Sequence, residues 1–487
     1  MSVGLTKWAR LRIILVGLGM ACFAVVLLGR FIHLQVIKGT ELREALDREV
    51  KKHCPVLPVR GLILDRRGVE LAISTEAYSL VAHPQQIKNA DLISRELAPI
   101  LGFSFLELNE LLTRARPFVF IQRHLSPVKE EAFRAWKDQT EDRARAARKR
   151  GERPDEDAIY LIPEAKRFYP QQCLAGPILG FCDIDGNGLE GLEHVFNEEL
   201  YGQPKKTVNM LDARGHIVIS GEKAWDPEVM GNNLVLTLDR TIQYIAEKEL
   251  EKGVRKWQAA GGLVMVTIPR TGEILAMAQG PRLDPNLPTQ YPKEARQNRV
   301  LTDALEPGSS FKVFIVASAL DAGVVKPEDR VHCENGVWRL GAKEVIHDVH
   351  PYGGLTVQQV IQKSSNIGAA KISHKLGPRH LDQYLRDFGF GKKTGLPFPG
   401  ETAGLVKNHQ HTRSLIDRTT TAFGQGVSVS VLQLTMALGA IGNGGVLMEP
   451  ILVKEIVSPK GDKVKEFSPR PVRRVISEET AATMLRI

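Results

Sequence analysis

The sequence predicts a multidomain α+β protein behind a single N-terminal membrane helix. At roughly 100 to 200 residues per domain, a chain of 487 residues has room for two or three domains. One long apolar run lies near the start of the chain. Further along, a strand, a helix and a hairpin follow one another in an order that is typical of an antiparallel sheet with helices packed on it.

Composition excludes several classes of protein. With 43% hydrophobic and 25% charged residues, the chain is neither disordered nor a polytopic membrane protein. The 65 Lys and Arg against 56 Asp and Glu give a net charge of +9. This charge fits a protein that acts beside anionic surfaces, but it is too diffuse to indicate nucleic-acid binding. The five cysteines form no dense framework. The sequence leaves undecided whether Cys173 and Cys182 form a disulfide.

The membrane helix is predicted at residues 13–36. From Ile13 to Gly29 no residue is charged, and the apolar character resumes after Arg30. At about 1.5 Å per residue this segment crosses a bilayer core of about 30 Å. Basic residues in the preceding segment 1–12 predict a cytoplasmic tail. No A-x-A-like site follows the run, so an uncleaved anchor is favoured over a signal peptide or a buried core helix.

The stretch 37–230 is predicted to form an elongated, non-catalytic pedestal. Residues 37–57 are polar and are predicted as a helical stalk. A short apolar strand then enters a charged glycine turn at 60–68, and a second strand follows. Charges of both signs are dense at 128–157, which favours a solvated helix or a flexible excursion and leaves a partner-binding face open. The block 167–193 is rich in turns and then helical.

A domain boundary is predicted near Gly231, so that residues 231–487 form a second domain. A fresh strand begins there, and Asp239 is predicted to cap a long amphipathic helix that ends at Trp257. Two further strands, 263–268 and 273–278, are joined by a hairpin turn.

The tetrapeptide S-x-x-K occurs twice in the chain. Ser126 precedes a proline and is predicted only to cap a helix, so we assign Ser126 and Lys129 no catalytic role. Ser309 and Lys312 open an apolar helix, and their spacing places the hydroxyl and the amine on one helix face. A desolvated lysine with a lowered pKa can take the proton of a serine nucleophile. On this tetrapeptide alone, a capping serine and a surface lysine remain the alternative.

A second element favours the catalytic interpretation. Ser364-Ser365-Asn366 lies between two helical stretches and matches the S-x-N partner of such a nucleophile. Ser364 is positioned to relay a proton beside Lys312, and Asn366 to orient a substrate amide.

These motifs resemble the penicillin-binding proteins. The nucleophile segment reads E-P-G-S-S-F-K (306–312) and is followed by S-S-N. The single anchor makes the chain similar to the class B, monofunctional group, as do four further motifs: R-G-L-I-L-D-R-R-G (60–68), R-F-Y-P (167–170), G-L-E-G-L-E (188–193) and G-Q-G-V-S-V-S (424–430).

The resemblance implies D,D-transpeptidase chemistry in a domain built on an antiparallel sheet with helices on both faces. Ser309 attacks the D-Ala-D-Ala carbonyl of a stem peptide, releases D-Ala and passes the acyl group to an amine on a neighbouring stem. Lys312 is the general base, and β-lactams acylate the same serine. No cofactor and no metal are implied. The implied substrate-binding residues are Ser310, Ser365, Gln425 and Gly426.

The motifs Leu71-Ala72-Ile73-Ser74 and His83-Pro84 look more like the division-type septal enzymes than the elongation type. The resemblance therefore implies a single-pass protein of the bacterial inner membrane, with its bulk in the periplasm. The implied partners are stem peptides, lipid-linked precursor strands, a polytopic glycosyltransferase and other division proteins. The other hypotheses are a non-catalytic scaffold that recruits wall-synthesis partners and a β-lactam sensor or hydrolase.

The third motif of the family, K-T/S-G, is expected well beyond the second. Lys393-Thr394-Gly395 follows Asn366 too closely and lies in a segment that resembles the family's F-G-F-G loop, so we interpret it as a decoy. The segment from Ser477 to Ile487 predicts a helix without a C-terminal cap. We therefore expect the catalytic domain to be incomplete at its C-terminal end.

A metal site is the remaining alternative. Cys333, His347, Asp348 and His350 include an H-x-x-H-like spacing, but the surrounding Pro and Gly residues predict a loop rather than a helix. We therefore expect no metal there.

Overall fold

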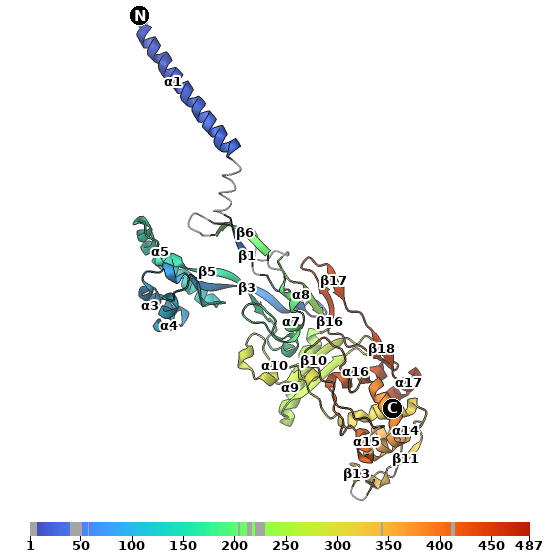
Figure 1. The fold of residues 1–487 in the computed structure, drawn as a ribbon. Coiled ribbons are helices and arrows are strands. Elements are labelled where there is room, and N and C mark those ends of the chain that lie inside the picture. The colour runs from blue at the N-terminus through green and yellow to red at the C-terminus, as the bar shows by residue number, and fades with distance from the viewer. Residues whose placement is uncertain are drawn as a thin grey trace. The chain divides into compact units, whose positions relative to one another are not determined.

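The computed structural model describes residues 7–38, 51–56, 58–202, 205–211, 217–219, 229–341, 344–410 and 414–487 (Figure 1). The chain forms two compact units. One unit contains Met1–Leu57 and Pro204–Val229, and the other contains Pro58–Gln203 and Met230–Ile487.

The first unit contains the membrane helix and a small sheet. Helix α1, Lys7–Ile32, continues into a π-helical turn η1, His33–Ile37. Its segment Leu11–Gln35 has a mean hydropathy of 2.6 and is long and apolar enough to cross a membrane, which agrees with the predicted anchor. The sheet is antiparallel, in the order β1 (Lys51–Val56), β6 (Lys205–Leu211) and β7 (Ile217–Ile219).

The predicted helical stalk at 37–57 is wrong at its C-terminal end. Residues 51–56 form β1, whose hydrogen-bonding partner β6 lies more than 150 residues further along the chain. A pairing partner so distant in sequence overrides the local preference for a helix. The part of the stalk at 39–50 lies outside the described residues.

In the second unit, the pedestal is built on one long strand. Strand β3, Glu70–Ala82, pairs with the whole of β5, Ile159–Phe168, from Ile73 opposite Phe168 to Ala82 opposite Ile159. Strand β4, Val119–Gln122, pairs with the end of β3. A separate core packs three helices on these strands: α3 (Ala90–Leu101), α4 (Phe105–Leu112) and α5 (Pro127–Lys149). The charge-rich segment is therefore largely the solvated helix α5.

A single sheet joins the pedestal to the catalytic domain. Strand β8, Asn233–Leu236, lies between β2, Ile63–Leu64, with which it is parallel, and β16, Val453–Val457, with which it is antiparallel. The order is β17-β16-β8-β2-β3-β4, with β17 at Lys463–Glu466. We expected the strand after Gly231 to share a sheet with the hairpin that follows. Instead it is buried between strands from both ends of the chain.

The hairpin forms its own two-stranded antiparallel sheet from β9, Gly262–Thr267, and β10, Ile274–Gly280. Helix α9, Arg240–Trp257, is capped by the Asp239 carboxylate as predicted. It packs on one face of the hairpin, where Ala246 of the helix meets Ala276 and Ala278 of β10. Met277 alternates with Ala276 and Ala278 along β10. Together with Met265 of β9 it faces the main core, where helix α16, Val431–Gly442, packs. Helices on both faces of the hairpin confirm the predicted arrangement.

The nucleophile segment lies at the centre of the catalytic domain. A 3₁₀ turn η5, Gly308–Phe311, runs into helix α12, Lys312–Asp321, whose side chains are nearly all buried. Among the described residues, the remaining α-helices are α6 (Gly176–Leu179), α7 (Gly191–Val195), α8 (Asn197–Tyr201), α10 (Lys293–Arg296), α11 (Arg299–Thr302), α13 (Val357–Gln362), α14 (Asn366–Asp387), α15 (Leu415–Thr421) and α17 (Glu478–Arg486). The remaining strands are β11 (Arg330–His332), β12 (Val337–Arg339), β13 (Val345–His347), β14 (Gly354–Thr356), β15 (Val446–Met448) and β18 (Pro471–Arg474).

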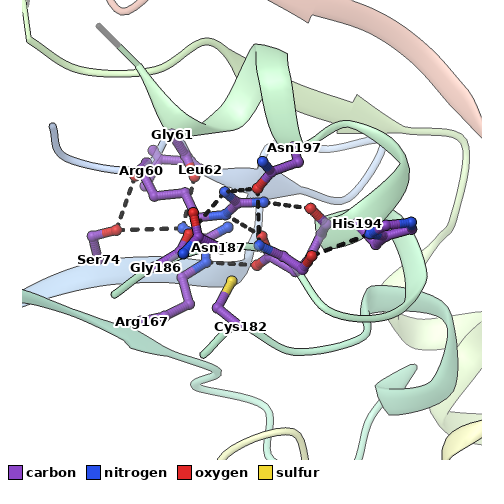
Figure 2. Close-up of polar contacts among 12 residues, drawn as sticks. Arg60, Gly61, Leu62, Ser74, Arg167, Cys182, Gly186, Asn187, His194 and Asn197 are labelled. Atoms are coloured by element: carbon purple, nitrogen blue, oxygen red, sulfur yellow. Dashed lines mark hydrogen bonds and ion pairs between the residues drawn. The ribbon is translucent and has the colours of Figure 1, made fainter. Parts of the chain in front are cut away.

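Three pedestal motifs meet in one buried ionic cluster. Figure 2 shows Arg60 and Arg167 converging there from two segments of the pedestal. Both guanidinium groups bind the carboxylate of Glu193, which is fully buried. Arg60 also donates to Asn197 Oδ1 at 2.8 Å, and Arg167 donates to the Gly61 carbonyl at 2.7 Å (Figure 2). Burial alone would raise the pKa of Glu193, but the two arginine charges outweigh it and hold the pKa below its ordinary value.

The thiols of Cys173 and Cys182 are both free, so the disulfide left open by the sequence is not formed in this structure.

Candidate active site

Ser309 and Lys312 lie in hydrogen-bonding contact at the start of α12. Lys312 Nζ is 3.2 Å from Ser309 Oγ, because the spacing of three residues places both side chains on one face of the helical turn. Ser309 is exposed, whereas only 2% of Lys312 is exposed. An accessible hydroxyl beside a buried amine is the arrangement that activates a serine nucleophile.

Aromatic packing holds this helix in place. Phe311 and Phe314 of the nucleophile segment contact Phe388 and Phe390 of the F-G-F-G segment, with ring centroids 5.0 to 5.1 Å apart for three of the pairs. All four rings are buried. The segment that also contains Lys393-Thr394-Gly395 therefore packs directly against the nucleophile segment.

The environment of Lys312 shifts its protonation equilibrium toward the neutral form. Burial lowers the pKa of the amine from 10.5 to about 8, and the negative charge of Asp348 opposes part of this effect. At neutral pH an appreciable fraction of the amine is therefore unprotonated. Only this form can accept a proton from Ser309.

Ser364 contacts the same amine with two oxygen atoms. Lys312 Nζ donates to the Ser364 carbonyl at 2.6 Å and lies 3.0 Å from Ser364 Oγ. Ser364 adopts a φ of 54°, in the left-handed region that serine rarely occupies. This conformation turns both oxygen atoms toward Lys312. The structure thus brings Ser309, Lys312 and Ser364 together, as the motifs predicted.

Asp348, one of the residues of the rejected metal site, orders the S-S-N motif. Its carboxylate accepts hydrogen bonds from Ser365 Oγ at 2.6 Å and from the backbone N–H groups of Asn366 and Ile367 at 2.5 and 3.0 Å. An anion at this position caps helix α14. A cluster of protein donors around an acidic side chain cannot be inferred from its spacing alone.

Two members of the motif differ in exposure. Ser365 is fully buried, and its hydroxyl accepts the Gly368 N–H as the N-cap of α14. Its predicted contact with substrate is replaced by a positioning role, because no part of the side chain reaches the surface. Asn366 is half-buried, and its amide nitrogen donates to the His347 carbonyl at 2.9 Å.

The G-Q-G segment borders the nucleophile. Gly424 accepts a hydrogen bond from the Gly308 N–H at 3.2 Å, and Gly426 donates to Glu306 Oε1 at 2.8 Å. Gly424 has a φ of 76°, and a Cβ there would lie 2.2 Å from the Gly308 carbonyl oxygen, so only glycine fits. Gln425 and Gly426 are exposed. Ser310 is also exposed, and its hydroxyl donates to the Pro307 carbonyl at 2.7 Å.

The two decoy motifs have other partners. Ser126 Oγ accepts the Lys129 N–H as the cap of α5, and Lys129 Nζ donates to Gln122 Oε1 at 3.2 Å. In the other decoy, Thr394 donates through its backbone N–H and its hydroxyl to Glu401, both at 2.6 Å. These contacts account for both sequences without catalysis.

The fold and this site define a membrane-anchored protein with the machinery of a serine acyltransferase. The profile for "Penicillin binding protein transpeptidase domain" matches residues 262–487, and that for "Penicillin-binding Protein dimerisation domain" matches residues 55–236. The "Probable peptidoglycan D,D-transpeptidase PenA" of Neisseria gonorrhoeae is 34% identical, and the match covers 96% of this chain and 78% of that protein. The chain belongs to the class B penicillin-binding proteins.

Two further similarities agree with this assignment. The "Peptidoglycan D,D-transpeptidase FtsI" of Escherichia coli strain K12 is 33% identical, with 92% of this chain and 73% of that protein covered. The crystal structure of a peptidoglycan synthetase from Bifidobacterium adolescentis has a TM-score of 0.64 and 27% sequence identity, and covers 89% of this chain and 81% of that one.

Proposed function

We propose that this protein is a peptidoglycan D,D-transpeptidase in which Ser309 is the nucleophile and Lys312 the general base. The observation that carries the proposal is the 3.2 Å contact between Lys312 Nζ and Ser309 Oγ, together with the lowered pKa of the amine. The two relatives described above are both named as peptidoglycan D,D-transpeptidases, which supports this reaction class. We assign 37–230 to the pedestal and 231–487 to the catalytic domain, divisions that the matched ranges support.

In the acylation step, neutral Lys312 takes the hydroxyl proton as Ser309 Oγ attacks the carbonyl carbon of the penultimate D-Ala. The C–N bond to the terminal D-Ala then breaks. Ser364, whose hydroxyl lies 3.0 Å from the amine, passes the proton from Lys312 to the leaving nitrogen. In the second step an amine on a neighbouring stem attacks the acyl-serine, forms the new amide and returns the proton to Ser309.

Asn366, Gln425 and Gly426 are proposed to position the substrate. Asn366 is half-buried and lies two residues after Ser364 in the chain. Gln425 and Gly426 are exposed, and the Gly426 N–H donates to Glu306, three residues before Ser309. The Asn366 amide nitrogen donates to a protein carbonyl, so its oxygen is the atom proposed to accept from a substrate amide N–H.

A labelling experiment tests the nucleophile. The full chain in detergent is treated with a fluorescent penicillin and digested, and the modified peptide is identified by mass. We expect one covalent adduct, on the peptide that contains Ser309, and no adduct in Ser309→Ala. An adduct on another residue would overturn the assignment. A properly folded protein without any adduct would favour the non-catalytic scaffold instead.

We also propose that the protein acts in septal wall synthesis at the inner membrane. The septal assignment rests on the 33% identity to FtsI and on the motifs at 71–74 and 83–84. The basic residues before α1 favour a cytoplasmic N-terminus. Stem peptides, lipid-linked precursor strands, a polytopic glycosyltransferase and other division proteins are the proposed partners.

Depletion of the protein in its native bacterium distinguishes the two roles. Septal enzymes close the division site, so cells that lose this protein are expected to elongate into filaments with normal width. Microscopy after transcriptional shut-off provides the measurement. Cells that become round and wide would assign the protein to elongation.

A further inference from the structure

A buried chain of three polar side chains lies outside the catalytic motifs. Asp382 of α14 accepts from His409 Nδ1 at 2.7 Å, and His409 Nε2 lies 3.1 Å from the hydroxyl of Thr421, the last residue of α15. Each of the three residues is no more than 3% exposed. The nucleophile, its base and the S-S-N motif use none of them.

The hydrogen bonds to the Asp382 carboxylate all come from the segment that contains His409. Besides the imidazole, its carboxylate accepts the backbone N–H groups of His409 and Gln410, both at 3.0 Å. A carboxylate buried this deeply is costly unless every oxygen is hydrogen-bonded, so the segment around His409 is fixed relative to α14. His409 then presents Nε2 to Thr421 from a fixed position.

A second histidine holds the same short helix. His374 of α14 lies with Nε2 2.9 Å from the hydroxyl of Thr419. Burial lowers the pKa of His374 to about 4, so this ring is neutral at physiological pH. Two imidazoles thus hold two threonines of α15, one within the helix and one at its C-terminal end.

The chain continues from Thr421 directly to the wall of the active site. The Gly424 N–H donates to the Thr421 carbonyl at 3.0 Å, and the Gly424 carbonyl in turn accepts the Gly308 N–H at 3.2 Å. Gly308 immediately precedes the nucleophile. A shift of Thr421 is therefore transmitted through two hydrogen bonds to the backbone of Ser309.

We propose that Asp382, His409 and Thr421 are positioning residues for the transpeptidase reaction. They fix the C-terminal end of α15, so that Gly424 holds Gly308 and keeps Ser309 Oγ within reach of Lys312. The pair His374 and Thr419 supports the same helix. None of these residues touches the substrate, and their effect on the reaction passes through the Gly424 contact.

Thr421→Val tests this proposal because it replaces the hydroxyl with a methyl group of similar size. The full chain in detergent is examined by two measurements: hydrogen exchange of the backbone in peptides covering 305–311 and 422–428, and the rate of acylation by a fluorescent penicillin. We expect exchange in both peptides to rise about tenfold, the typical effect of one lost buried hydrogen bond. The maximal acylation rate should fall by about the same factor, with little change in the penicillin concentration that gives half of that rate.

Two variants provide controls. Thr421→Ser keeps the hydroxyl and is expected to restore both measurements. Thr140→Val removes a buried hydroxyl in pedestal helix α5 that donates only to carbonyls of its own helix, at 3.0 and 3.2 Å, and is expected to leave both active-site peptides unchanged.

Wild-type exchange at 305–311 after Thr421→Val would overturn the proposal, even if the protein were less stable. An equal rise in exchange throughout the protein would also overturn it, since the role would then be purely structural. If Thr421→Val does not fold, His409→Asn provides the same comparison. The acylation measurement rests on the proposed function, whereas the hydrogen-exchange measurement does not. If the wild-type protein is not acylated, hydrogen exchange therefore still tests the proposal.

Discussion

Replacement of Lys312 by methionine is expected to slow acylation of Ser309 by roughly 10²–10⁴-fold, the usual contribution of a positioned general base. Methionine retains much of the buried volume but cannot accept the hydroxyl proton. The wild-type rate is expected to rise with pH and to level off above about pH 8, because the neutral fraction of an amine with a pKa of about 8 grows over that range. The Lys312→Met variant should lose this dependence. Stopped-flow labelling with a fluorescent penicillin between pH 6 and pH 10 measures both effects.

The second S-x-x-K sequence supplies a matched control. Lys129→Met changes the same position of the same pattern. The Lys129 amine donates to two pedestal groups, the Leu101 carbonyl and Gln122 Oε1, so this variant should leave the acylation rate unaltered. A Lys312→Met variant that retained the pH dependence of the wild type would show that another group is the base.

Replacement of Glu193 by glutamine is expected to lower the free energy of unfolding by about 3–5 kcal/mol, the cost of removing one partner from a buried ion pair. The variant leaves the guanidinium groups of Arg60 and Arg167 without a compensating charge in a fully buried site. The effect is expected as an earlier midpoint in urea unfolding of the detergent-solubilised protein, followed by circular dichroism.

An exposed ion pair provides the comparison for Glu193. Glu249 pairs with Lys252 at 2.7 Å on the surface of α9, where solvent screens the interaction. Glu249→Gln should therefore leave the urea midpoint where it is in the wild type. Equal effects of the two substitutions would contradict the importance that we assign to the buried cluster.

The sequence predicted those parts of the site that depend on local geometry. A spacing of three residues on a helical turn brings Ser309 to Lys312, and the N-cap of α9 by Asp239 follows from the residue type at the start of an amphipathic segment. The interpretation of Lys393-Thr394-Gly395 as a decoy also came from its local context and stays a prediction. In each case the interacting groups lie within a few residues of one another, so the pattern carries the necessary information.

The sequence could not predict contacts between distant segments. The surroundings of Asp348 were missed, because nothing near it in sequence shows that three donors from residues 365–367 surround its carboxylate. The contact of Gly424 with Gly308 was missed for the same reason. Strand β1 was predicted as a helix because its partner β6 lies far along the chain.

The sheet shared by the two domains has a consequence for how the protein is made. Ile63 pairs with Leu234, and the Thr237 hydroxyl donates to the carbonyl of Ile451, which lies 214 residues further along. The ribosome produces the chain from its N-terminus, so one edge of β2 stays unpaired until β8 has been made. The other edge of β8 then stays unpaired until β16 has been made. Pairings this distant in sequence form slowly, and open strand edges invite association with other chains. The sheet that carries the pedestal strands is therefore completed only after β16 has been made, and we expect the nascent protein to depend on chaperones that cover these edges.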